Sequence, residues 1–181
     1  MKSVLISIKP KWCELIANGK KTIEVRKARP KCDTPFKCYI YCTKDKDISF
    51  WTGKRYAYAD DRSHNLFDVC GNGKVIGEFI CNKIDRLAVC GYDNRNTELR
   101  RIDNNLTAYD LDYDYLNKCQ LSPDNLKKYS NGSGLYGWYI SDLVIYDKPK
   151  SIKEFYHYGV RRGAKVTRPP QSWCYCEELK E

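Results

Sequence analysis

The chain has 181 residues, of which 42% are hydrophobic, and a formal net charge of +9. Its 15 Tyr and 4 Trp residues exclude a solvated, disordered tail, and its length suits one domain with a modest core. The sequence contains no run of about 18 apolar residues and no signal-peptide core, so it predicts neither a membrane span nor secretion. A cytoplasmic location is the expected default.

The positive charge is unevenly distributed. Residues 1–31 hold nine Lys and Arg residues against two Glu residues, whereas residues 93–114 hold six acidic residues against three Arg residues. A basic region separated from an acidic one favours a polyanionic partner, because solubility alone requires no such separation. The pattern predicts a nucleic-acid partner, with simple solubility as the alternative.

The first part of the chain predicts three strands and one helix. An apolar run at 4–8 indicates a buried strand. Pro10 suits the first position of a helix, and Gly19 suits the left-handed turn that ends it. A strand with charges of both signs follows at 21–27, and an aromatic-rich strand follows at 36–43.

The middle of the chain alternates irregular segments with one clear strand. Residues 44–72 are polar and are interpreted as a surface insertion. Asn72-Gly73 is a tight-turn signal, and the apolar-rich segment 74–81 after it predicts a strand. Residues 91–106 have the composition of a loop.

The second half begins with helical signals and ends with strands. Ser122 and Pro123 have the residue types of an N-cap and first helical position, and Asn131–Gly134 stop that helix. Further elements are expected at 111–116 (helical turn), 135–146 (strand, with a bend at Gly137), 150–156 (one or two helical turns) and 172–176 (closing strand).

Ten cysteines require an explanation. A reducing compartment would keep them as thiols, and no Cys-x-x-Cys motif is present. Cys38 and Cys42 would lie about 13 Å apart along a strand, too far to share a zinc ion, while Cys174 and Cys176 could supply two ligands only. We therefore interpret the cysteines as small buried hydrophobic residues, and predict no metal and no cofactor.

The expected elements define an α+β fold. Five or six strands with short helices inserted between them, and no regular βαβ rhythm, favour a mixed β-barrel over a Rossmann fold. No phosphate-binding glycine loop occurs. We expect one domain over residues 1–181, with the surface insertion at 44–72.

Several motifs, taken together and in order, resemble the ASCH domain family of the PUA-like superfamily, in its bacterial and phage members. The resemblance covers nearly the whole chain outside 44–72 and 91–106. Its motifs are Val4–Pro10, Gly19–Lys27, Gly77–Phe79, Trp138–Leu143 and Pro169–Tyr175. It implies a PUA-like β-barrel with flanking short helices, a cleft beside the first helix and second strand, and RNA or DNA binding in many relatives. We expect this cleft to be basic, and RNA to be favoured over DNA as the partner.

The resemblance also implies an enzymatic alternative. One group of relatives removes an acyl group from a modified cytidine, and another is described as a ribonuclease. The deacylating group uses a Gly-x-Lys-Thr-x-Thr-x-Arg segment and a distant glutamate. Gly19, Lys21, Thr22 and Arg26 match that segment, but Glu24 stands where its catalytic threonine would be.

If the protein is an enzyme, Lys21, Glu24 and Glu78 are the candidate catalytic residues. A desolvated Lys21 could act as a base or nucleophile, and the carboxylates could relay a proton. Strand alternation puts Glu24 and Arg26 on one face and Lys21 on the other. Lys21 and Glu24 therefore converge only if the turn after Gly19 rotates Lys21. The alternative is a Glu24–Arg26 surface pair.

If the protein is a binding module, basic side chains would neutralise phosphates while Arg26, Glu24 and aromatic rings would hold a base. Trp138 could instead pack in the core. The candidate nucleic-acid-binding residues are Lys9, Lys20, Lys21, Thr22, Glu24, Arg26, Lys27, Trp138, Tyr139, Ser141, Arg161, Arg162, Arg168 and Gln171. A domain that binds a protein partner is a third alternative. The ligand and the oligomeric state stay open.

Overall fold

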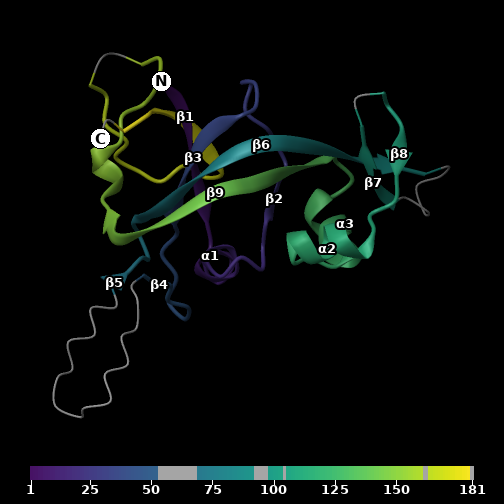
Figure 1. The fold of residues 1–181 in the computed structure, drawn as a ribbon, viewed down its shortest axis with the longest axis horizontal. Helices are drawn as coiled ribbons and strands as arrows, with labels where there is room; N and C mark the ends of the chain where they lie inside the picture. The colour runs from purple at the N-terminus through teal and green to yellow at the C-terminus, as the bar shows by residue number, and fades with distance from the viewer. Residues whose placement is uncertain (53–68, 92–97, 104, 161–162, 180–181) are drawn as a thin grey trace, which may run out of the picture. The chain divides into compact units, whose positions relative to one another are not determined.

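The computed structural model describes residues 1–52, 69–91, 98–103, 105–160 and 163–179, and the fold is α+β (Figure 1). Its elements, in chain order, are β1 (Lys2–Ile8), α1 (Pro10–Ala17), β2 (Ile23–Arg26), β3 (Phe36–Cys42), β4 (Trp51–Thr52), β5 (Val69–Cys70), β6 (Val75–Cys90), β7 (Glu98–Ile102), β8 (Ala108–Tyr109), α2 (Tyr113–Cys119), α3 (Pro123–Ser130), β9 (Leu135–Lys150), the 3-10 helix η1 (Ile152–Glu154) and β10 (Trp173–Glu177).

The chain divides into two compact units. The first unit consists of Met1–Ala17, Lys37–Phe79 and Asp142–Glu181, and the second unit consists of Asn18–Phe36 and Ile80–Ser141. The long strands β6 and β9 each contribute residues to both units. Each unit has its own hydrophobic cluster.

The first unit is built around β1. This strand pairs in parallel with β3 and antiparallel with β10. Its residues Ser3–Ile8 are all buried, which explains why the sequence of this strand is a continuous apolar run without alternation. Tyr39 and Phe155 pack edge to face in the core of this unit, with ring centroids 4.9 Å apart.

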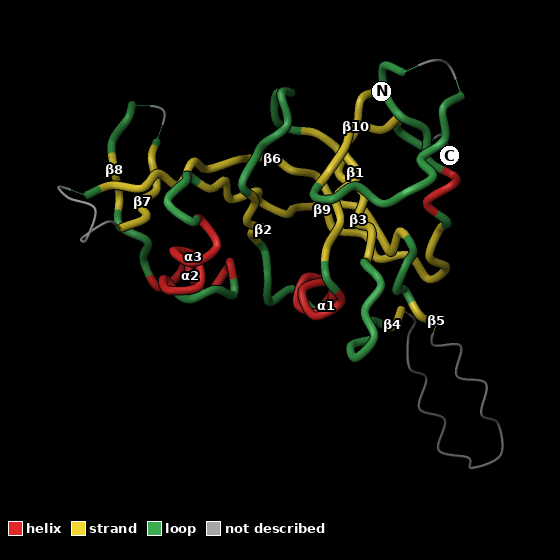
Figure 2. Tube along the Cα trace, turned by 180° about the vertical axis from the view of Figure 1, so that it is seen from behind, coloured by secondary structure: helices red, strands yellow, loops and turns green. Residues whose placement is uncertain are grey.

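The second unit packs two short helices, α2 and α3, against strands (Figure 2). β2 pairs antiparallel with β9, and β7 pairs antiparallel with β6 and β8. Asp112 caps α2 by accepting the backbone N–H of Tyr115 at 2.7 Å, and Ser122 caps α3 by accepting that of Asn125 at 3.2 Å. The predicted start of α3 is thereby confirmed.

The predicted strand count is too low. Pairing among the described residues gives an eight-stranded sheet and a separate β4–β5 ribbon. Two-residue strands such as β8 have no readable periodicity, and β7 lies in the segment 91–106 that was expected to be a loop. The strand expected at 74–81 continues to Cys90.

The α+β class is confirmed, but among the described residues the pairing does not close the sheet into a barrel. Most of the expected insertion, residues 53–68, lies outside the described residues, as do 92–97. None of the described helices is long and apolar enough to cross a membrane. Six of the ten cysteines are buried.

Candidate functional site

The turn between α1 and β2 places Lys21. Gly19 has a φ of +74°, a left-handed conformation that glycine adopts without strain. The backbone of Thr22 then donates to the carbonyl of Lys118 at 3.0 Å and accepts from the N–H of Ile140 at 2.9 Å. Because β2 begins only at Ile23, the alternation of side chains along the strand does not determine which way the Lys21 side chain points.

Lys21 and Glu24 do converge. The Nζ atom of Lys21 lies 3.4 Å from Oε2 of Glu24, and Nε of Arg26 lies 3.0 Å from Oε1 of the same carboxylate. These three residues are called the buried ladder below. The expected Glu24–Arg26 pair therefore exists, but it is buried and not on the surface: the side chains of Glu24 and Arg26 are 7% and 12% exposed.

The C-terminal end of helix α2 contacts Lys21 of the ladder. Lys21, whose side chain is 2% exposed, donates from Nζ to the carbonyl oxygen of Cys119 at 2.6 Å. Cys119 is the last residue of α2, where the helix dipole favours a cation. The buried ammonium thus has a carboxylate and a helix carbonyl as partners, as buried charges require.

The thiol of Cys119, which is completely buried, has the same low-polarity surroundings. Burial raises the pKa of the Cys119 thiol to about 12, with Glu24 adding to the rise and Lys21 opposing it. Partial burial raises the pKa of Tyr129 on α3, which is 39% exposed, and Arg26 opposes that rise. The ammonium of Lys27 lies over the Tyr129 ring, 5.3 Å from its centroid.

Glu78, the third candidate catalytic residue, has different partners. It belongs to the first unit, where its carboxylate lies 3.1 Å from Nζ of Lys37 and accepts a hydrogen bond from the hydroxyl of Tyr146. Lys37 also contacts Glu178 at 3.2 Å. Burial opposes the charge of Lys37, but these hydrogen bonds outweigh it and raise its pKa. The described contacts of Glu78 therefore tie it to the first unit.

The candidate binding residues differ in exposure. Lys9, Lys20, Lys27, Arg168 and Gln171 are exposed, whereas Arg161 and Arg162 lie outside the described residues.

Three of the expected ligand-binding side chains have internal roles. Trp138 is completely buried and meets Phe36 edge to face at 5.9 Å, so its ring is not available for stacking on a base; that expectation is wrong and the core alternative holds. Tyr139 donates its hydroxyl to Asp85 at 2.8 Å, and Ser141 donates to the carbonyl of Ile80 at 2.9 Å. Thr22 is partly buried.

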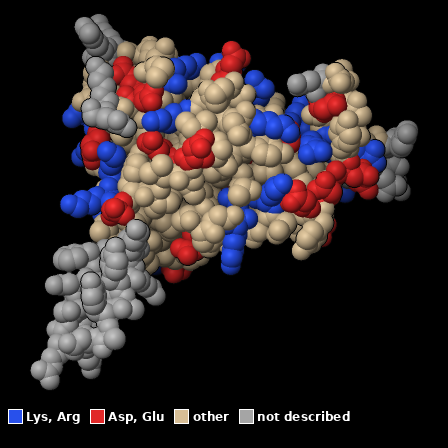
Figure 3. All heavy atoms as spheres, viewed as in Figure 1, with Lys and Arg blue, Asp and Glu red and all other residues tan. Residues whose placement is uncertain are grey.

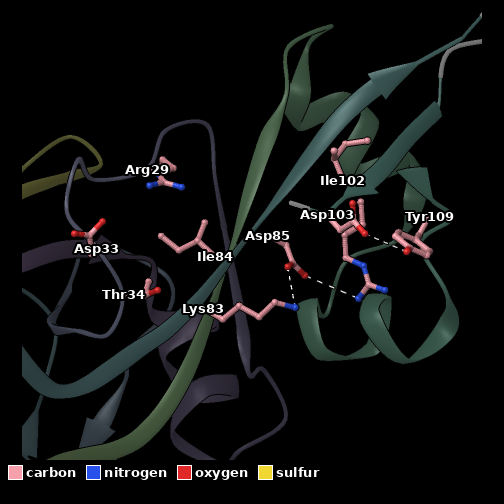
Figure 4. Close-up of a pocket in the computed structure, with 10 residues that line it drawn as sticks. Arg29, Asp33, Thr34, Lys83, Ile84, Asp85, Ile102, Asp103 and Tyr109 are labelled. Atoms are coloured by element: carbon pink, nitrogen blue, oxygen red, sulfur yellow. Dashed lines mark hydrogen bonds and ion pairs between the residues drawn. The ribbon is translucent and has the colours of Figure 1, made fainter. Parts of the chain in front are cut away.

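A pocket of about 710 Å³ opens elsewhere in the second unit (Figure 4). We call it the second-unit pocket. Three segments form it: the connection between β2 and β3, the middle of β6, and the β7–β8 hairpin. Its lining residues are Arg29, Asp33, Thr34, Lys83, Ile84, Asp85, Arg101, Ile102, Asp103 and Tyr109. None of these lining residues is among the candidate site residues predicted from the sequence.

Asp85 is the residue that sequence reasoning missed. Its side chain is 8% exposed, and it accepts from Tyr139 at 2.8 Å, contacts Lys83 at 3.0 Å and faces Arg101 at 3.9 Å (Figure 4). The available signal was periodicity, because Asp85 and Leu87 are both buried on one face of β6. An acidic residue at a core-facing strand position is unusual unless it is paired.

The fold defines an α+β protein with one large mixed sheet and short helices. The family model of the ASCH domain matches residues 6–84. The structure is similar to that of ASCH from Zymomonas mobilis, with a TM-score of 0.56, 19% identity, and coverage of 97% of this chain and 88% of that one. The structure of a tyrosine-to-phenylalanine mutant of the same protein is also similar, with a TM-score of 0.55 and 19% identity. This similarity covers 98% of this chain and 92% of that one.

The serine-to-alanine mutant of ASCH from Zymomonas mobilis gives a TM-score of 0.55 and 19% identity, over 97% of this chain and 89% of that one. At 19% identity this similarity shows the fold alone. A comparison with curated proteins finds no match. The resemblance to the ASCH family, a branch of the PUA-like superfamily, is confirmed by the family model and the fold together.

Within the described part of the chain, no group of three or more His, Cys, Asp or Glu residues is arranged to hold a metal ion. All ten cysteines are free thiols.

Proposed function

We propose that this protein binds nucleic acid, RNA in preference to DNA and single-stranded or modified in preference to duplex, through exposed cations around β2. The observation that carries the proposal is how charge is divided in this segment. Glu24 pairs with the buried Lys21 and the largely buried Arg26, whereas Lys20, Lys27, Arg29 and Lys31 are exposed. Exposed cations bind phosphates and release counterions.

The ASCH domain supports this proposal, since PUA-like domains are generally RNA-binding modules. On the face drawn in Figure 3, Lys and Arg side chains are interspersed with acidic ones. On that face, Lys and Arg side chains would contact phosphates individually. We expect the affinity to fall as the salt concentration rises.

The candidate residues divide into two roles. Lys20 and Lys27 lie on either side of the buried ladder in sequence and would contact phosphates directly. The ladder would hold this segment in place, and Arg26, 12% exposed, is the member best able to reach a base. Lys9, Arg161, Arg162, Arg168 and Gln171 remain proposed contacts of the first unit, and Tyr139, Thr22 and Ser141 of the second.

Fluorescence anisotropy with labelled single-stranded RNA, single-stranded DNA and duplex RNA, each over a range of salt concentration, tests this proposal. The double variant Lys20→Gln, Lys27→Gln should weaken binding and lower the salt slope by about one for each phosphate that is no longer neutralised. Lys128→Gln on α3, also exposed, is the matched control. Binding at low salt no stronger than that of an acidic control protein would overturn the proposal.

The second candidate function is hydrolysis of a modified nucleoside or of RNA. The 3.4 Å approach of Lys21 to Glu24 in buried surroundings favours it, because a desolvated lysine beside a carboxylate can exchange a proton with it. Lys21→Ala should then abolish turnover of one member of a panel of acylated nucleosides and RNAs. The melting temperature, measured in parallel, distinguishes lost chemistry from lost folding. A panel that yields no product with the unmodified protein would exclude this function for those substrates.

A further inference from the structure

The second-unit pocket contains as many acidic as basic side chains, but two of its carboxylates are already engaged. Asp85 accepts from Tyr139 and Lys83 and faces Arg101. Asp103 accepts the backbone N–H groups of Asn105 and Thr107 at 2.9 and 2.8 Å, together with the hydroxyl of Tyr109 at 3.1 Å. Both carboxylates therefore hold the pocket together.

The basic side chains retain donors that these contacts do not use. An ammonium has three donors and a guanidinium has five. The side chain of Lys83 is 56% exposed and that of Arg101 is 31% exposed, so both reach solvent while Asp85 anchors them. Arg29 is exposed on the opposite wall of the pocket (Figure 4). The pocket is formally neutral but offers mainly donors, which favours an anionic ligand.

An aromatic ring lies among these donors. Tyr109 is 44% exposed, and its bond to Asp103 fixes the ring at the end of the β7–β8 hairpin. The guanidinium of Arg101 lies 5.6 Å from the ring centroid of Tyr109 and 5.7 Å from that of Tyr115. A planar guanidinium and a half-exposed ring offer two surfaces on which a nucleobase can stack.

We infer that the second-unit pocket binds a nucleotide unit, with its phosphate near Arg29 and Lys83 and its base against Tyr109 and Arg101. A volume of about 710 Å³ lies within the range of about 300–1,000 Å³ typical of small-molecule sites, so a whole nucleotide fits. A phosphate ion alone would leave the aromatic side unused. The same chemistry is met by a free mononucleotide and by a phosphorylated nucleotide at the end of a strand.

Lys20 and Lys27 are not among the residues that line this pocket, and nucleotide binding here does not require polymer binding there. Isothermal titration calorimetry at low salt with AMP, GMP, CMP and UMP provides the first measurement. Parallel titrations use the four unphosphorylated nucleosides, inorganic phosphate, and a trinucleotide with and without a 5′-phosphate. Melting temperatures confirm that each variant is folded.

Two variants and two matched controls locate the ligand. Arg29→Gln should weaken mononucleotide binding about tenfold and leave nucleoside binding unchanged, and Tyr109→Leu should weaken it by about fivefold or more, the loss expected for one stacked base. Arg86→Gln, an exposed arginine on the opposite face of β6 from Asp85, and Tyr113→Leu, an 84% exposed tyrosine, should change affinity less than twofold.

The outcomes are distinct. Saturable binding of at least one mononucleotide with this pattern of losses supports the inference for a free nucleotide. Binding of the 5′-phosphorylated trinucleotide alone, with the same losses, supports it for a strand end. The inference is overturned if no nucleotide or trinucleotide saturates the protein, if Arg29→Gln and Arg86→Gln are equivalent, or if inorganic phosphate binds as tightly as the mononucleotides.

Discussion

The buried ladder and the second-unit pocket have the same arrangement of charges, but their cations differ in exposure to solvent. Each is a carboxylate between two cations, Glu24 between Lys21 and Arg26, and Asp85 between Lys83 and Arg101. The carboxylates are equally buried, with side chains 7% and 8% exposed. The cations differ: those of the ladder are 2% and 12% exposed, whereas those of the pocket are 56% and 31% exposed.

This difference in exposure decides whether a cation stabilises the fold only or is also able to bind a ligand. A cation that is buried with its carboxylate cannot bind a ligand without breaking the fold locally, because an unpaired buried charge costs several kcal/mol. A cation that is anchored by a buried carboxylate but reaches solvent is positioned and still able to bind. Lys21 of the ladder has the first arrangement, and Lys83 and Arg101 of the pocket have the second. Arg26, whose side chain is 12% exposed, lies between the two.

The largest effect should come from removing the ladder's carboxylate charge. Glu24→Gln leaves two buried cations without a counter-charge and should lower the free energy of unfolding by about 3–5 kcal/mol. Urea denaturation measures this loss. Glu98→Gln is the matched control, since its side chain is 72% exposed beside Arg100 and should cost about 1 kcal/mol or less. Equal losses in the two variants would contradict a buried ladder.

Asp85→Asn should cost less than Glu24→Gln. The Asn side chain keeps one acceptor for Tyr139, and water can solvate Lys83 and Arg101 once their partner is neutral. We expect a loss of about 1.5–3 kcal/mol, the range for hydrogen bonds to charged groups. Asp114→Asn, with an exposed carboxylate beside Lys118, provides the baseline. A loss for Asp85→Asn larger than that for Glu24→Gln would reverse the comparison.

Gly137→Ala should also destabilise the second unit. A Cβ atom at this position of β9 would clash with the hydroxyl of Tyr115 and lie 3.1 Å from a methyl group of Ile23. The added group should cost about 1–3 kcal/mol. The buried Tyr115 hydroxyl has no hydrogen-bond partner within the described residues, so Tyr115→Phe should recover part of the loss. Thermal unfolding of both single variants and the double variant decides whether this clash is the cause.

The smallest effect concerns the thiol that adjoins the ladder. Since burial raises the pKa of Cys119 to about 12 from an ordinary value of 9.0, its thiolate fraction at pH 8 should be roughly a thousandfold below that of an ordinary thiol. Mass spectrometry after alkylation should find Cys119 unmodified while the partly exposed Cys32, Cys70 and Cys90 react. Equal labelling of Cys119 and Cys90 would show that the ladder is open to solvent.

The same shift fixes the direction of a pH effect on stability. A thiol with a raised pKa stays protonated in the folded protein after the unfolded chain has begun to ionise. Its contribution to the free energy of unfolding is therefore complete below pH 9 and falls as the pH rises from about 9 towards 12.

Local signals predicted the elements well, and pairing over long distances was not visible in the sequence. Pro10 and Gly19 bracket α1, and Ser122 with Pro123 begins α3, because caps and breakers act on their own neighbours. The hydrogen bond from Lys21 to Cys119 joins residues 98 positions apart, and no local pattern encodes it.

The candidate site was only partly predictable for the same reason. Strand alternation made the convergence of Lys21 and Glu24 conditional on the turn after Gly19, and the structure meets that condition. Composition identified a basic segment, yet it could not show that Lys21 and Arg26 both form ion pairs with Glu24. Trp138 has the residue type of a stacking platform, but its position on β9 buries it.

We expect the exposed cations and the open pocket of the second unit to bind nucleotides while the ladder stays closed. Amide chemical shifts measured by NMR during titration with a short 5′-phosphorylated RNA test this expectation. We predict shifts at Lys20, Lys27, Arg29, Lys83 and Tyr109, with little change at Glu24. Shifts confined to the first unit, or an absence of saturable shifts at low salt, would contradict it.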